Sequence, residues 1–310
     1  MRYSRQEIYL GKKAQRLIEK AKVSIIGLGA LGTVSAELLA RSGIGELILI
    51  DRDTIEESNL QRQSLFTESD LNLPKAVQAK KALEKINSKI KITSYFDHLD
   101  NENIKKIKAE LILDCTDNLE TRFLLNEFAI KNKISLIYAS AIRNKGYVYS
   151  ILNNKPCLKC ILKNSETTET CETSGVLNTI TVVVASLQVN EVIKILANKK
   201  PEENLIFIDL ENNSITKIKT KKDPKCPVCN NKFEYLSGKK SLNLSQHCNS
   251  FILKKNFNFN ETKRKLRNIG IQDFGDVFKF QNMTIFKNSV LIKSKSKKEA
   301  FSAYSKYIGN

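Results

Sequence analysis

The sequence contains no tryptophan and only two histidines, His98 and His247, and neither histidine lies in a recognisable motif. No stretch reaches the ~18 uninterrupted apolar residues expected of a membrane-spanning helix. Residues 1–10 carry polar and charged side chains throughout and lack the apolar run of a signal peptide. We therefore expect a cytoplasmic protein without a membrane span, and we assign both histidines to the structure or the surface.

The apolar fraction of 41% and the charged fraction of 27% are ordinary for a soluble globular protein. A chain of 310 residues can form one large domain, or one domain with a small appendage. The formal net charge is +18, and residues 231–310 hold 16 Lys and Arg against 5 Asp and Glu. This uneven distribution indicates a solvated lysine surface, with an acidic protein or RNA as the alternative partner.

Short apolar strands alternate with helical segments over residues 22–139. The alternation predicts an α/β fold with a doubly wound, mostly parallel Rossmann-like sheet. Residues 146–152 and 201–219 predict an added antiparallel part, and residues 181–196 are apolar enough for a buried helix. We expect the parallel strands at residues 22–26, 46–50, 90–95, 111–114 and 134–139, and helices at 33–41 and 75–86.

A domain boundary is expected near Pro224 and Pro227, which divides the chain into residues 1–230 and 231–310. The second part has a pattern of its own, from which we predict a small, basic C-terminal α+β domain. Its expected elements are a basic helix at 261–268, strands at 277–280, 283–286 and 289–293, and a helix at 297–307.

A G-x-G-x-x-G turn, with Gly27, Gly29 and Gly32, lies between a predicted strand and a predicted helix. Such a turn brings backbone amides and a helix N-terminus close to a phosphate or ribose. Asp51 ends the next strand, where its carboxylate can accept hydrogen bonds from ribose hydroxyls. These features alone fit an NAD-dependent dehydrogenase as well as an ATP enzyme.

Three further charged residues favour ATP. Arg62 and Lys75 are cations in loops or at helix starts, and they suit a triphosphate. Asp117 lies just past a predicted strand, at the edge where open α/β sheets bind ligands, and a carboxylate there can hold Mg²⁺. An NAD enzyme has no use for two such cations and a metal carboxylate.

Four of the seven cysteines form two Cys-x-x-Cys pairs, Cys157 with Cys160 and Cys226 with Cys229. In a chain without a secretory signal this spacing favours a metal over disulfides. Four thiolates make a closed tetrahedral Zn²⁺ site, which is structural because no coordination position stays open. The alternative is two unrelated redox or free pairs.

The remaining cysteines differ in their surroundings. Cys171 follows a polar, Thr-rich run that we interpret as a mobile crossover loop, so it is a candidate nucleophile or sulfur-transfer thiol. We expect Cys115 to be a buried strand residue and Cys248 to be non-catalytic.

Over residues 1–230 the sequence resembles the MoeB/ThiF/HesA family, the bacterial and archaeal relatives of ubiquitin-activating enzymes. The similarity follows in order along the chain and several of its motifs are five or more residues long. The matching positions are residues 2–6, the glycine turn of Gly27, Gly29, Ala30 and Gly32, the pair Asp51 and Asp53, the segment of Ser58, Asn59, Leu60, Gln61, Arg62 and Gln63, then Lys75, and residues 115–118, which end in Asn118.

The resemblance implies a role for each matching residue. Asp51 would bind ribose, and Asp117 would coordinate Mg²⁺. The phosphates of ATP would be surrounded by Asn59, Arg62 and Lys75. Arg5 would reach the γ-phosphate of the neighbouring subunit, which implies a homodimer. The plainer alternatives are a surface charge for Arg5, a helix-terminal lysine for Lys75 and a helix cap for Asp117.

The implied reaction is ATP-dependent adenylation of the C-terminal glycine carboxylate of a ubiquitin-like sulfur carrier (ThiS- or MoaD-like), with release of pyrophosphate. The carrier would end in Gly-Gly and serve thiamine, molybdopterin or tRNA thiolation. The family has the same four zinc-type cysteines, and a cysteine at the place of Cys171 has a covalent role in some members. Because no rhodanese domain follows, the sulfur donor would be a separate cysteine desulfurase or rhodanese.

Three other functions compete with this interpretation. A relative of the tRNA threonylcarbamoyladenosine dehydratase would share the ATP fold and suit the positive charge, but residues 58–63 and the four cysteines are more typical of the carrier-activating branch. An NAD-dependent oxidoreductase is disfavoured by Arg62, Lys75 and Asp117. A degenerate scaffold that binds a carrier without activating it is disfavoured by the intact nucleotide residues.

Overall fold

The computed structural model describes residues 2–162, 174–240, 244–247, 250–254 and 257–309, with the backbone alone for residues 244–247. The chain forms two compact units, Met1–Gly238 and Lys239–Asn310, and each is described by itself. The described side chains do not include Cys171, Cys248 and His247, which were discussed above.

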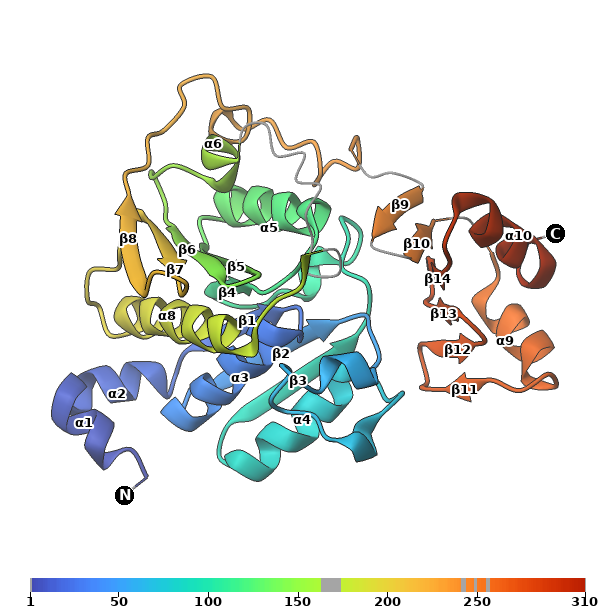
Figure 1. Cartoon of the computed structure of the whole chain (residues 1–310), viewed down its shortest axis with the longest axis horizontal. Coiled ribbons are helices and arrows are strands. Elements are labelled where there is room, and N and C mark those ends of the chain that lie inside the picture. Colours follow the sequence, from blue (N-terminus) through green and yellow to red (C-terminus); the bar gives the residue numbers. More distant parts are fainter. Residues whose placement is uncertain (1, 163–173, 241–243, 248–249, 255–256, 310) are drawn as a thin grey trace. The chain divides into compact units, whose positions relative to one another are not determined.

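The first unit contains an eight-stranded sheet with the strand order β3-β2-β1-β4-β5-β6-β7-β8 (Figure 1). The strands from β3 to β5 in this order are parallel, and β6, β7 and β8 continue the sheet antiparallel. This confirms the predicted Rossmann-like sheet with an added antiparallel part. The strands are β1 (Lys22–Ile26), β2 (Glu46–Asp51), β3 (Lys91–Phe96), β4 (Leu111–Asp114), β5 (Ser135–Ile142), β6 (Lys145–Ile151), β7 (Leu205–Asp209) and β8 (Ser214–Ile218).

Helices cover both faces of this sheet because neighbouring strand residues point to opposite sides. Ile25 packs in the apolar core with α3, α4 and α8, whereas Ile26 packs in the core with α5 (Figure 1). The strands are therefore buried on two sides, as doubly wound sheets require. The helices are α1 (Ser4–Leu10), α2 (Lys12–Ile18), α3 (Ala30–Ser42), α4 (Lys75–Ile86), α5 (Leu119–Asn132), α6 (Leu158–Ile161) and α8 (Asn178–Leu196).

Helix α8 is long and apolar enough to cross a membrane by length and composition alone. In the structure it packs against α3, β5 and β6. The amide of Gln188 donates hydrogen bonds to the carbonyls of Asp114 (3.1 Å) and Ile137 (2.9 Å), which lie inside the sheet. These contacts make α8 the core helix that the sequence predicts at residues 181–196.

The first unit ends at Gly238, later in the chain than the boundary expected after residue 230. Residues 231–238 belong to the first unit because the Glu127 carboxylate on α5 holds them. It accepts hydrogen bonds from the backbone N–H groups of Glu234 (3.0 Å) and Leu236 (2.9 Å).

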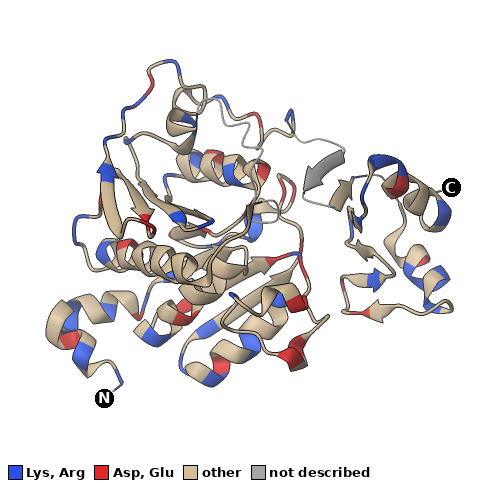
Figure 2. Ribbon diagram, in the orientation of Figure 1, with Lys and Arg blue, Asp and Glu red and all other residues tan. Residues whose placement is uncertain are grey.

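The second unit is an antiparallel sheet with the order β11-β12-β13-β14-β10-β9, joined by two helices. Both helices begin at a side-chain cap: Asn258 accepts from the N–H of Glu261, and Ser296 from that of Glu299. Figure 2 shows Lys and Arg along both helices. The elements are β9 (Leu244–His247), β10 (Ser250–Leu253), α9 (Phe259–Arg267), β11 (Gln272–Asp273), β12 (Phe278–Phe280), β13 (Met283–Ile285), β14 (Val290–Lys293) and α10 (Lys297–Tyr307).

Candidate functional site

The glycine turn joins β1 to α3, and two of its glycines are required by the packing. Gly27 has φ 88°, and a Cβ there would lie 2.7 Å from the carbonyl oxygen of Cys115. A Cβ at Gly32 would lie 1.9 Å from the oxygen of Gly27. At Gly29, the N-cap of α3, the nearest atom to such a Cβ is Gln63 Nε2 at 3.9 Å, so this side of the turn has room for a ligand. Ala30 then starts the helix.

Asp51 closes β2 beside this turn. Its Oδ2 accepts a hydrogen bond from Leu28 N (2.6 Å) and its Oδ1 accepts one from Asp53 N (2.7 Å). Burial raises the pKa of Asp51 to about 6, and the charge of Lys75 opposes that rise. The carboxylate is therefore ionised at neutral pH and keeps lone pairs that can accept hydrogen bonds from ribose hydroxyls.

Lys75 is a buried cation, 7% exposed, at the first residue of α4. The helix dipole disfavours a cation there by ~0.3–1 kcal/mol, and buried lysines need an anionic partner. Its Nζ lies 3.8 Å from Asp53 Oδ2, and Arg52 Nε lies 3.9 Å from Asp53 Oδ1. Lys75 is thus a helix N-terminal lysine, as the plainer alternative has it, but it is buried beside Asp51 and Asp53, and a cation there can also bind the anionic oxygen atoms of a phosphate.

The segment of residues 58–63 folds back toward the glycine turn. Asn59 is buried, and its Oδ1 accepts a hydrogen bond from Glu56 N (3.2 Å) at the 3₁₀ helix η1 (Glu57–Asn59). Arg62 donates to the Ser58 carbonyl (2.7 Å), a hydrogen bond within its own segment. Gln63 is buried next to Gly29, and its Oε1 has no hydrogen-bond partner among the described residues.

The other members of this segment have different surroundings. Ser58 and Gln61 are exposed, whereas Leu60 packs against the main apolar core.

The loop after β4 carries Asp117, whose side chain is exposed. Its neighbour Asn118 is the N-cap of α5, with Oδ1 accepting from Thr121 N (2.9 Å). The cap of this helix is thus Asn118, which leaves the Asp117 carboxylate open to solvent. The close approach of Gly27 to Cys115 places this loop beside the glycine turn. An exposed carboxylate beside the glycine turn is a donor that could hold Mg²⁺ together with a nucleotide and water.

The remaining predicted residue of the site, Arg5, lies exposed on α1. Within the described part of the chain it makes no hydrogen bond or ion pair, and α1 contains no buried residue. The structure therefore does not bring Arg5 to the nucleotide residues of its own chain.

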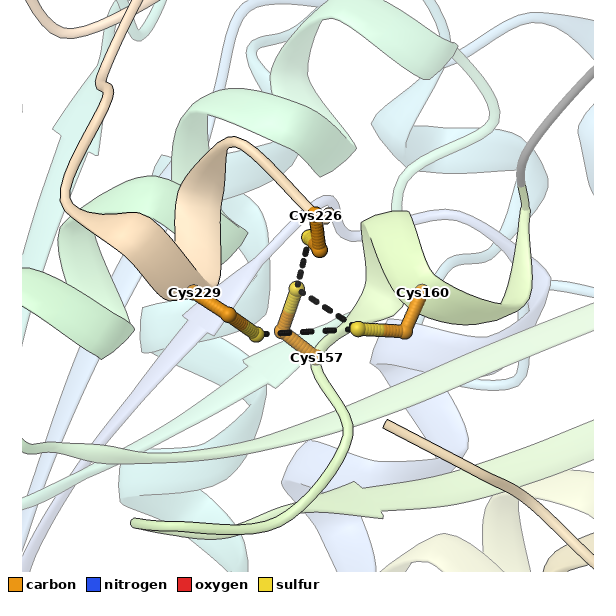
Figure 3. Close-up of side chains that lie close together, drawn as sticks. All are labelled: Cys157, Cys160, Cys226 and Cys229. Atoms are coloured by element: carbon orange, nitrogen blue, oxygen red, sulfur yellow. Dashed lines mark hydrogen bonds between the residues drawn. The ribbon is translucent and has the colours of Figure 1, made fainter. Parts of the chain in front are cut away.

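Cys157, Cys160, Cys226 and Cys229 meet in one cluster (Figure 3). The sulfurs of Cys157 and Cys226 are 3.6 Å apart, as are those of Cys160 and Cys229, and all four lie within 4.8 Å of one another. Sulfurs bound at ~2.3 Å around one tetrahedral Zn²⁺ lie about 3.8 Å apart. The two pairs thus form a single site that can hold one zinc ion.

Hydrogen bonds in the surrounding segments fix the cluster. The Tyr149 hydroxyl donates to the Pro156 carbonyl (2.9 Å), and Asn126 Oδ1 accepts from Leu158 N (2.8 Å). Burial raises the pKa of the Cys157 thiol, so its thiolate is disfavoured unless a cation lies beside it. A zinc ion would supply that cation and link the segment after β6 to the segment after β8.

Comparison with known proteins agrees with this geometry. The ThiF family model matches residues 3–228. The chain is 37% identical over 247 residues to the sulfur carrier protein ThiS adenylyltransferase of Bacillus subtilis. The aligned region covers 76% of this chain and 74% of that protein. It is 36% identical over 238 residues to the molybdopterin-synthase adenylyltransferase of Salmonella typhimurium. This alignment covers 74% of this chain and 96% of that protein.

Among solved structures, E. coli MccB with ATP superposes with a TM-score of 0.65 at 27% identity, over 74% of each chain. The fold and the site thus define an adenylyltransferase. The chain belongs to the ThiF family. The C-terminal unit, Lys239–Asn310, lies outside the matched family region.

Proposed function

We propose that this adenylyltransferase transfers AMP from ATP to the C-terminal carboxylate of a ubiquitin-like sulfur carrier that ends in Gly-Gly. The observation that carries the proposal is the common position of the glycine turn, Asp51, Lys75 and the Asp117 loop at the carboxyl edge of β1, β2 and β4. The named relatives support the carrier as substrate, since their names specify ThiS and molybdopterin synthase.

The chemistry needs positioning and charge neutralisation more than proton transfer. A carrier carboxylate is already ionised at neutral pH, so it attacks the α-phosphorus of ATP without a general base. The bond to the pyrophosphate oxygen breaks, and a mixed acyl–phosphate anhydride forms. Lys75 and Arg62 would neutralise the phosphate charge as it moves onto pyrophosphate. Mg²⁺ held by Asp117 would supply further positive charge.

The carrier adenylate is an activated acyl group that a sulfur nucleophile can attack. We propose that a separate cysteine desulfurase or rhodanese delivers sulfur to it in the cytoplasm, for thiamine, molybdopterin or tRNA thiolation. Cys171 remains a candidate sulfur-transfer thiol, outside the described residues.

ATP–pyrophosphate exchange tests the proposal. The purified protein should catalyse exchange when a Gly-Gly carrier is added. It should not catalyse exchange when the carrier lacks its last glycine, because the shortened C-terminus no longer places the carboxylate at the α-phosphorus. Exchange driven by tRNA alone, or reduction of a nicotinamide cofactor, would contradict the proposal and favour one of the other functions.

The pKa of Asp51 predicts a pH dependence of nucleoside binding. Because burial raises that pKa to about 6, the carboxylate becomes protonated as the pH falls from 7.5 toward 5.5 and loses its charge-assisted bonds to ribose. We expect adenosine affinity to fall several-fold over this range, by about 1 kcal/mol. Calorimetry with adenosine avoids the titration of phosphate. Asp51→Asn should bind weakly at both pH values, and an equal pH response in that variant would show that another group titrates.

The exposed position of Arg5 predicts an active site shared between two copies of the chain. On the same helix Ile8 is 77% and Tyr9 80% exposed, which is the apolar surface that a partner copy would cover. We therefore propose that Arg5 enters the ATP site of the partner subunit in a homodimer. Arg5→Ala and Asp117→Ala should each be inactive alone.

A mixture of these two variants should recover part of the activity. In a mixed dimer, one site would contain both substitutions and the other would contain neither. Recovery requires exchange of subunits, which a mass or fluorescence label can demonstrate. If labelled subunits exchange and the mixture stays inactive, Arg5 does not act across the interface.

A further inference from the structure

Two charged residues outside the predicted nucleotide set hold the turn that presents Asp117. Asp114, the last residue of β4, is completely buried, and its Oδ1 accepts hydrogen bonds from both Thr116 N (3.0 Å) and Thr116 Oγ1 (2.7 Å). From the other side, Arg122 Nη2 donates to the Thr116 carbonyl (2.5 Å). The N–H, the hydroxyl and the carbonyl of Thr116 are thus all bound by these two side chains.

The environment of Arg122 fixes its guanidinium. The residue lies in the first turn of α5, its side chain is 13% exposed, and its guanidinium lies 5.1 Å from the centre of the Tyr138 ring. A cation stacked on an aromatic face and largely removed from water has a restricted geometry. Arg122 therefore links α5 to the loop after β4 with a side chain of restricted geometry.

The distances show what this pair is arranged to hold. Arg122 Nε lies 3.9 Å from Asp114 Oδ2, beyond hydrogen-bond length, and that oxygen has no hydrogen-bond partner among the described residues. The structure shows short hydrogen bonds that join both side chains to Thr116. A pair that served only to stabilise the core would be expected to make the paired hydrogen bonds that Asp and Arg form with each other.

Asp117 is therefore bracketed by two fixed residues. Thr116 is bound on three groups, and Asn118 is fixed as the cap of α5. We propose that Asp114 and Arg122 are positioning residues, which set the direction of the Asp117 carboxylate toward the metal bound with ATP without touching either. This inference rests on the proposed role of Asp117 as the Mg²⁺ ligand.

The proposal separates two parts of nucleotide binding. In the proposed site, the glycine turn, Asp51 and Lys75 would contact the nucleotide whether or not a metal is present. Asp114 and Arg122 should influence only the part that depends on Mg²⁺, because they act through Asp117. Loss of a residue that orients a metal ligand typically lowers metal affinity ~10–100-fold.

Calorimetry of ATP binding, with Mg²⁺ and with EDTA, measures the Mg²⁺-dependent part of the ATP affinity without any catalytic turnover. In the wild-type protein Mg²⁺ should strengthen ATP binding, and Asp117→Asn should remove the strengthening. Arg122→Gln should reduce the ratio of the two affinities about 10-fold, and its affinity in EDTA should stay at the wild-type value. Arg41→Gln is the matched control, since Arg41 pairs with Glu37 on the exposed side of α3.

A second variant keeps the test valid if Arg122→Gln unfolds. Removing Arg122 alone leaves the buried Asp114 carboxylate without its cation, which is costly. Asp114→Asn/Arg122→Gln is neutral and of similar shape, so it should melt near the wild-type temperature and still lose the Mg²⁺ effect.

The possible outcomes separate this inference from the proposed function. If both Arg122 variants keep the wild-type affinity ratio while Asp117→Asn loses it, the positioning role is overturned and the proposed role of Asp117 stands. If Asp117→Asn also keeps the ratio, Asp117 is not the metal ligand and the inference fails with that assignment.

Discussion

Asp117→Ala should lower the rate of carrier-dependent ATP–pyrophosphate exchange ~100-fold or more. The substitution removes the exposed carboxylate in the loop after β4 that we propose holds Mg²⁺ on the phosphates. The fold should stay intact because Asp117 is exposed and the cap of α5 is supplied by Asn118. The measurement compares exchange rates at saturating ATP with thermal melting of the same samples.

Asp276→Ala provides the matched control for this prediction. It removes a carboxylate that is 82% exposed, but from the C-terminal unit, and should leave exchange unchanged. Near-normal exchange by Asp117→Ala would show that another residue holds the metal, and would remove the basis for placing the phosphates at this loop.

Cys226→Ser should release zinc and lower the free energy of unfolding by several kcal/mol, because binding of a structural metal contributes directly to folding. At ~2–4 °C per kcal/mol, the melting temperature should fall by roughly 10 °C. The affinity for ATP at a temperature where the protein is folded should change little, since the cluster belongs to the segments after β6 and β8. Elemental analysis, thermal melting and ATP calorimetry together check the expectation.

Two comparisons sharpen the zinc prediction. Wild-type protein treated with a strong chelator should melt at the temperature of Cys226→Ser. Cys115→Ala removes a buried thiol that bonds to Gln188 and lies outside the cluster, so this variant should keep its zinc. A wild-type protein that contains no zinc after purification without chelators would contradict the assignment of the four cysteines.

The large elements of the fold were predictable because their sequences repeat a pattern. Strands such as Lys22–Ile26 and Glu46–Asp51 are rich in Val, Ile and Leu, and α8 is a long apolar segment. The helices α1 and α2, each seven residues long, were not expected from the sequence. Helix α1 buries no residue, and its apolar side chains Ile8 and Tyr9 are exposed, so no core-facing pattern reveals it. The strands β9, β10 and β11 were also not predicted, whereas the similarly short strands β12, β13 and β14 were.

The candidate site residues that belong to a short sequence motif were predictable. The glycine turn follows β1, Asp51 ends β2, and the two Cys-x-x-Cys pairs have metal-type spacing. The hold on Thr116 by Asp114 and Arg122 was not predictable, because it joins the end of a strand to the next helix through an irregular turn. The cap at Asn118 likewise needed coordinates, since Asp117 and Asn118 are both good cap residues.

The direct test of the central claim is the mass of the intact carrier after incubation with the protein, ATP and Mg²⁺. The account predicts that a carrier ending in Gly-Gly gains the mass of one adenylyl group at its C-terminal glycine. The same carrier without that glycine, or with Asp117→Ala in place of the wild-type enzyme, should stay unmodified. If the wild-type protein binds ATP but adenylates none of the Gly-Gly carriers of its own organism, the carrier is not its substrate.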